Sequence, residues 1–227
     1  MKTMEKVSNC FFIKSILIGW GLCCLVYAVM FCSFFWGNHD WEYIRHGADL
    51  NSGFFEVRYS QHILSVLFFN GQFLPVMTML CALLGLAALA VFLGVYLRVP
   101  FNILAYIGLI LFVGLNPHIF VLFYYQHILL SFVYWPLICL MAIYWFEQKQ
   151  TIFKFLVLVI TLVGGLGSYP PFFTLIFCAF ITRQLIDYVE ERKKITDIIY
   201  ICGNFVLALL LAFGVQKIIH LWLVKVG

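Results

Sequence analysis

Seven apolar runs, each near the length that crosses a lipid bilayer, set the strongest limit on how this chain can fold. A bilayer core about 30 Å thick takes roughly 20 consecutive apolar residues in a helix. Apolar residues make up 64% of the chain and charged residues 11%, which is too little polar surface for a soluble domain. The sequence predicts an all-α, polytopic protein of about seven transmembrane helices, forming a single transmembrane domain over residues 1–227. The runs occupy about 15–36, 73–97, 101–115, 128–146, 151–167, 171–186 and 198–223.

Lysine and arginine fall mainly on one side of this predicted bundle. With the N-terminus in the cytoplasm, ten basic residues are cytoplasmic, and only Arg45, Arg58, Lys217 and Lys225 are outside or near the outer face. Short cytoplasmic loops carry such an excess, so we expect a cytoplasmic N-terminus and an outer C-terminus. The net charge of +4 follows from this topology and from anionic lipid of the inner leaflet, so it gives no reason to expect a nucleic-acid partner.

The one long connection, residues 37–72, follows the first apolar run on the outer side. Asn38 can cap a short helix that Gly47 ends, and a later amphipathic segment puts Ile63 and Leu67 on one helical face. We expect two short amphipathic helices lying on the outer membrane surface. Five of the six histidines and all four non-cytoplasmic acids fall on this outer side: His39, His46, His62, His118, His127, Asp40, Glu42, Asp49 and Glu56.

Three other features make structural predictions. The stretch from Asp187 to Asp197 mixes acids and bases after the sixth run, which predicts a solvated helix end. Gly164-Gly165 predicts a close contact between two helices. The eight cysteines lie in or beside apolar runs without C-x-x-C spacing, so we interpret them as small apolar residues.

Two carboxylates in the segment 39–46, Asp40 and Glu42, follow the first run closely. A carboxylate near a low-dielectric surface can act as a general base, because desolvation raises the pKa of a carboxyl group toward neutrality. The alternative is a structural role, in which Glu42 pairs with Arg45 or His46 on one helix face.

Arg58 is the second candidate, because a planar guanidinium can grip two oxygens of a phosphate. Its alternatives are contact with a lipid headgroup and pairing with Glu56. The outer histidines form no i, i+4 pair and no H-E-x-x-H pattern, so we expect no metal site.

A first apolar run, a long outer loop that opens with an acidic motif, and hairpins with short connections together resemble the GT-C superfamily of membrane glycosyltransferases. More narrowly, Asn38-His39-Asp40-Trp41-Glu42, followed by Gly53 and Arg58-Tyr59-Ser60, resembles the bacterial Gtr-type O-antigen glucosyltransferases. The sequence departs from that family in two ways. His39-Asp40 stands where two adjacent acids are usual, and family members are usually much longer, so the chain is expected to correspond to their catalytic core.

The resemblance implies a GT-C-like fold and a role for each candidate residue. Asp40 would be the catalytic base with Glu42 as a second acid, and Arg58 with Arg45 would bind the phosphate of a polyprenyl phosphate sugar donor. The acceptor would be a cell-surface polysaccharide such as lipopolysaccharide O-antigen, and the enzyme would need no cofactor. Further donor or acceptor contacts would come from His62, His118, His127 and Tyr169.

The implied location is the bacterial inner (cytoplasmic) membrane, with the site facing the periplasm. A flippase and a donor-synthesising transferase would be partners, besides membrane lipid. Two alternatives stay open. A transporter or flippase of a lipid-linked solute predicts charged or broken helices near the bilayer midplane, whereas these runs carry few charges away from their ends. A non-catalytic membrane subunit is the other.

Overall fold

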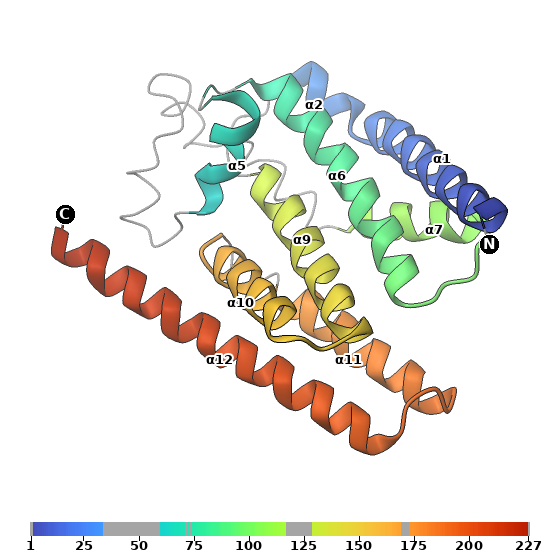
Figure 1. The fold of residues 1–227 in the computed structure, drawn as a ribbon. Helices are drawn as coiled ribbons and strands as arrows, with labels where there is room; N and C mark the ends of the chain where they lie inside the picture. Colours follow the sequence, from blue (N-terminus) through green and yellow to red (C-terminus); the bar gives the residue numbers. More distant parts are fainter. Residues whose placement is uncertain are drawn as a thin grey trace.

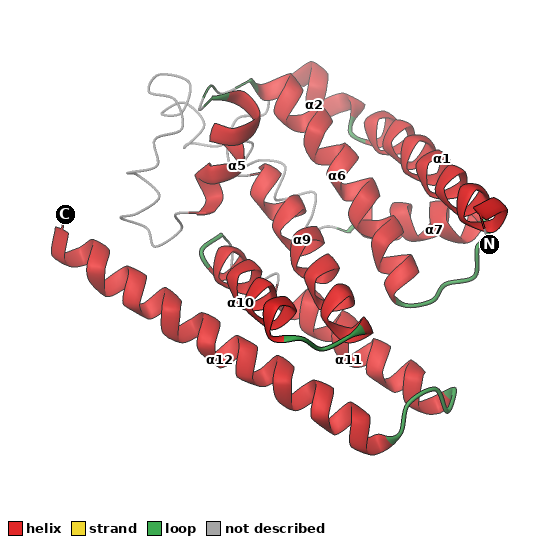
Figure 2. Cartoon of the chain, viewed as in Figure 1, coloured by secondary structure: helices red, strands yellow, loops and turns green. Residues whose placement is uncertain are grey.

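The structure, a computed structural model, describes residues 2–33, 60–70, 72, 74–116, 129–168 and 173–226. In these ranges the regular structure is entirely α-helical, as Figure 2 shows, so the all-α prediction is confirmed for this part of the chain. The helices, labelled in Figure 1, are α1 (Lys2–Val26), α2 (Ala28–Ser33), α5 (Ser60–Phe69), α6 (Pro75–Tyr96), α7 (Ile103–Gly114), α9 (Leu129–Gln148), α10 (Ile152–Leu166), α11 (Phe173–Val189) and α12 (Ile195–Val226).

Three of the described helices are long and apolar enough to cross a membrane: Pro75–Tyr96, Leu129–Gln148 and Ile195–Trp222. The apolar helices α7 and α10 have 12 and 15 residues. At about 1.5 Å per residue they reach only about 18 and 22 Å, short of a bilayer core of about 30 Å. Length and composition therefore support three crossings in the described ranges, where the sequence predicted about seven.

Short connections join α6 to α7, α9 to α10, and α11 to α12, so the carboxyl ends of α6, α9 and α11 gather at one end of the bundle (Figure 1). Ion pairs and hydrogen bonds join them there, and we call this the ion-cluster end. At the opposite end α5 lies beside the start of α9, and we call it the junction end. The 20 residues of α9 separate the two ends by about 30 Å.

The core forms around α6 and α9, which contribute residues to both clusters of buried side chains. One cluster joins these two helices to α10, α11 and α12, and the other joins them to α1, α5 and α7. Close approach needs small residues, because a Cβ atom at Gly85 of α6 would lie 2.9 Å from the Tyr134 ring of α9. The close contact predicted at Gly164 is confirmed, since its Cβ would lie 2.4 Å from the Trp135 ring.

The helix α5 was expected to lie on the membrane surface, but its first residue is buried inside the bundle. Ser60 is fully buried, and α5 packs against α9 through Leu64, which belongs to the same buried cluster as Leu130 and Val133. The other side of α5 is exposed, with Leu67 at 72%. The amphipathic pattern therefore marks a helix that enters the bundle at its amino end.

Candidate functional site

The residues predicted to perform chemistry fall almost entirely outside the described ranges, so their geometry stays a prediction. His62 is a residue of α5. The others lie in the gaps between the described ranges: Asp40, Glu42, Arg45, Arg58, His118, His127 and Tyr169. The described residues form two polar groupings, one at each end of the bundle.

The first grouping surrounds Ser60, two residues after Arg58 in the sequence. The Ser60 hydroxyl donates to the carbonyl of Gly164, and the Ser60 amide donates to the carbonyl of Gly167 at 3.2 Å. The Ser60 carbonyl in turn accepts from Trp135 Nε1 at 3.1 Å and from Ser131 Oγ at 3.4 Å. We call these five residues the Ser60 junction.

The junction satisfies backbone groups that the end of α10 leaves open. A helix leaves its last four carbonyls without partners inside the helix, and an unpaired carbonyl in an apolar setting costs several kcal/mol. Ser60 supplies donors for two of these carbonyls, and Gln216 Nε2 of α12 donates to Leu166 O at 3.1 Å. The amino end of α5 is thereby fixed to α9 and α10 through main-chain atoms.

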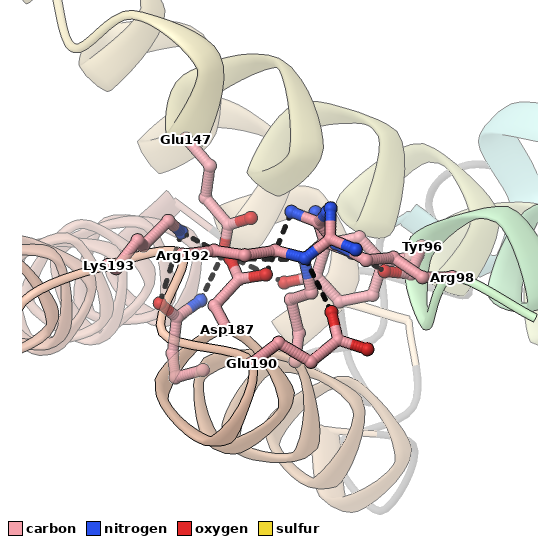
Figure 3. Close-up of polar contacts among 9 residues, drawn as sticks. Tyr96, Arg98, Glu147, Asp187, Glu190, Arg192 and Lys193 are labelled. Carbon is pink, nitrogen blue, oxygen red and sulfur yellow. Dashed lines mark hydrogen bonds and ion pairs between the residues drawn. The ribbon is translucent and has the colours of Figure 1, made fainter.

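The second grouping, which we call the ion cluster, consists of Tyr96, Arg98, Glu147, Arg183, Gln184, Asp187 and Lys193. Figure 3 labels five of these residues: Tyr96, Arg98, Glu147, Asp187 and Lys193. Asp187 on α11 is fully buried, with three cations around it. Arg98 Nη2 lies 2.8 Å from Asp187 Oδ1, while Lys193 Nζ and Arg183 Nε lie 2.9 Å and 3.5 Å from Oδ2. These contacts balance the buried carboxylate and join the segments after α6 and α11 to α11 itself.

Backbone geometry aims Arg98 at Asp187. α6 ends in a Schellman-type turn, in which Val99 N donates to Gly94 O at 2.8 Å and Arg98 N donates to Val95 O at 3.1 Å. Arg98 occupies the left-handed position of this turn with φ of 60°, where glycine is usual and another residue costs about 1–2 kcal/mol. The ion pair with Asp187 offsets that strain.

Glu147, near the carboxyl end of α9, completes the ion cluster. Its Oε1 accepts from Tyr96 OH at 2.9 Å and from Gln184 Nε2 at 2.6 Å. Lys193 Nζ donates to Gln184 Oε1 at 3.4 Å, so the two carboxylates share one hydrogen-bonded network. The network connects the ends of α6, α9 and α11 with the segment just before α12, and we call this role a latch.

The prediction of a solvated helix end from Asp187 to Asp197 is wrong for Asp187 and correct for the exposed Glu190 and Asp197. The reason is that Arg98, 89 positions away in sequence, supplies a charge that no local pattern reveals. A local signal did exist, because Arg183 and Asp187 form an i, i+4 pair inside an otherwise apolar helix.

The two groupings are suited to different roles. Each acid and base of the ion cluster already holds a partner from another part of the network, which suits a structural latch. The Ser60 junction consists of neutral groups and fixes Ser60, a residue within the predicted loop 37–72. Among the residues searched within the described ranges, no group of three metal-ligating side chains gathers.

Comparison of this chain with protein-family models, with curated proteins and with solved structures gave no match. Function is therefore argued from the residues and their arrangement.

Proposed function

We propose that the chain is a membrane glycosyltransferase that moves a sugar, most simply glucose, from a polyprenyl phosphate carrier to a cell-surface polysaccharide such as lipopolysaccharide O-antigen. The observation that carries the proposal is the acidic motif Asn38-His39-Asp40-Trp41-Glu42 directly after the first apolar run, with Arg58 later in the same loop. A bacterial inner membrane with the site in the periplasm is part of the proposal.

The proposed reaction assigns one step to each group. The acceptor hydroxyl oxygen bonds to the anomeric carbon while the bond from that carbon to the carrier phosphate breaks. The hydroxyl proton goes to Asp40, and the carrier leaves as a phosphate monoester whose charge Arg58 and Arg45 stabilise. A positioned base contributes about 10²–10⁴ in rate, and aligned cations on a leaving phosphate add a comparable factor. Glu42, His62, His118, His127 and Tyr169 are proposed to orient the sugar and the acceptor.

The described structure supports this proposal in one respect. Arg58 precedes Ser60 by two residues, and Ser60 is anchored by four hydrogen bonds at the end of the bundle opposite the ion cluster. A phosphate-binding residue needs such a fixed neighbour, since a loss of alignment reduces catalysis steeply.

A transporter is a weaker candidate. Intramembrane charges that serve transport lie near the bilayer midplane. In the described ranges the buried charges instead lie toward a helix end, with Arg183 six residues and Asp187 two residues before the end of α11.

The test is sugar transfer by the full chain in liposomes, with a labelled polyprenyl phosphate sugar as donor and O-antigen polysaccharide as acceptor. Asp40→Asn keeps the shape of the side chain but removes the proton acceptor, so the rate should fall by about 10² or more. Glu42→Gln is the matched control and should cost less. Wild-type activity in both variants would rule out the loop base, and an inactive wild-type chain would favour the non-catalytic subunit.

A further inference from the structure

The helix α10 ends before it has crossed a bilayer core, and α5 begins at the place where it ends. α10 has 15 residues, about 22 Å, and its carboxyl-terminal carbonyls accept from Ser60, the first residue of α5. A helix end without partners inside the bilayer costs several kcal/mol, so this contact is what allows α10 to stop early.

The meeting of the two helices is end to end. The Ser60 amide donates to Gly167 O as the next turn of a continuing helix would, although the two residues are 107 apart in sequence. Side-chain packing of α5 is with α9, and in Figure 1 α5 begins near the end of α10 and takes a different direction from there. The negative carboxyl end of the α10 dipole therefore faces the positive amino end of α5, which is favourable.

Together the helices have the length that neither has alone. Their 15 and 10 residues make 25, or about 37 Å of helix, against a bilayer core of about 30 Å. The neighbouring helix α9 continues past the junction. Trp135, which bonds to Ser60, lies six residues after the start of α9, so about 9 Å of α9 extends beyond the point where α10 ends.

Neighbouring side chains hold the Ser60 junction in place. The Trp135 ring packs against Gly164, where a Cβ atom would lie 2.4 Å away, and the same indole donates to the Ser60 carbonyl. Ser60 itself is fully buried. The carbonyl, amide and hydroxyl of Ser60 thus all have partners within the described bundle.

We propose that α10 and α5 form one composite membrane crossing, joined at Ser60. The crossing does not depend on the proposed transferase.

Depth measurements on spin labels test the crossing without any activity assay. Labels replace Leu156 and Ile160 on α10 and Ile63 and Leu67 on α5, one at a time in the cysteine-free full chain in liposomes, with oxygen and a nickel chelate as relaxants. A composite crossing predicts four successive depths, with each one-turn step along either helix about 6 Å. Equal depth at Ile63 and Leu67 would show that α5 lies flat on the surface and would overturn the proposal, as would the reverse order.

A junction variant checks the role of Ser60. Ser60→Ala should increase the mobility of the label at Ile63, because the hydroxyl bond to Gly164 is lost. Ser15→Ala is the matched control, since Ser15 is equally buried but its hydroxyl bonds only to Phe11 O within α1. Equal effects of the two variants would overturn the junction. Failure of sugar transfer alone would count against the proposed function and leave the depth result to decide the crossing.

Discussion

Asp187 shows how one residue can control the ends of several helices. It is fully buried, and its three cationic partners come from the segment after α6, from α11 itself and from the segment before α12. Removing one partner from a buried ion pair costs more than the pair contributes, because the remaining charges lose their compensation. The carboxylate is therefore more important to the bundle than any one of the cations.

We predict that Asp187→Asn destabilises the protein by about 3 kcal/mol, the lower part of the range for a broken buried pair, because Arg98 and Lys193 keep partial access to solvent. The apparent melting temperature in detergent is the measurement. Glu190→Gln is the control, since Glu190 pairs with Arg192 at an exposed site and should cost at most about 1 kcal/mol. Equal melting temperatures for the two variants would contradict the latch.

At the scale of elements, packing at glycines decides how closely helices approach. Gly164 contacts the Trp135 ring, whereas Gly203 on α12 has no atom within 4 Å of its missing Cβ. Both lie inside helices, where alanine is favoured over glycine by about 1 kcal/mol when space allows.

We predict different outcomes for the same glycine-to-alanine substitution at these two positions. Gly164→Ala should lower the melting temperature, because the methyl group displaces the indole that donates to Ser60. Gly203→Ala should leave it unchanged or raise it. A neutral Gly164→Ala variant would mean that the Trp135 ring can move without loss of the junction.

The positions of the helices along the chain can be predicted from the sequence, but the contacts between helices cannot. The apolar runs at 73–97 and 128–146 coincide with α6 and α9 within two residues, because hydrophobic length is a local property. The early end of α10 and the burial of Ser60 depend on each other across 104 residues, so no window of the sequence contains both. The predicted catalytic residues, lying outside the described ranges, are neither confirmed nor contradicted.

At the scale of the whole molecule, charge separates along the bundle. Between the start of α6 and the start of α12, the described basic residues lie at or near the ion-cluster end, where short cytoplasmic loops would place them: Arg98, Lys149, Lys154, Arg183, Arg192, Lys193 and Lys194. Described residues that border the gaps, among them Ser60, Leu129 and Gly167, lie at the junction end. The two ends are therefore suited to opposite sides of a membrane.

We predict that the junction end faces outward. In a cysteine-free chain, cysteine at the exposed Gln72 should react with an impermeant thiol reagent in intact cells, and cysteine at the exposed Lys149 only after lysis. The reverse pattern would invert the topology and exclude a periplasmic site.

The Ser60 junction also sets an order of events during synthesis. Ser60 leaves the ribosome 104 residues before Gly164, and at about 5–20 residues per second its partner follows roughly 5–20 s later. During that interval α5 cannot rest on α10 and must wait in the translocation machinery or at the lipid interface. The composite crossing is thus completed after α9 has been made, and newly made chains that stop before residue 164 should keep α5 accessible.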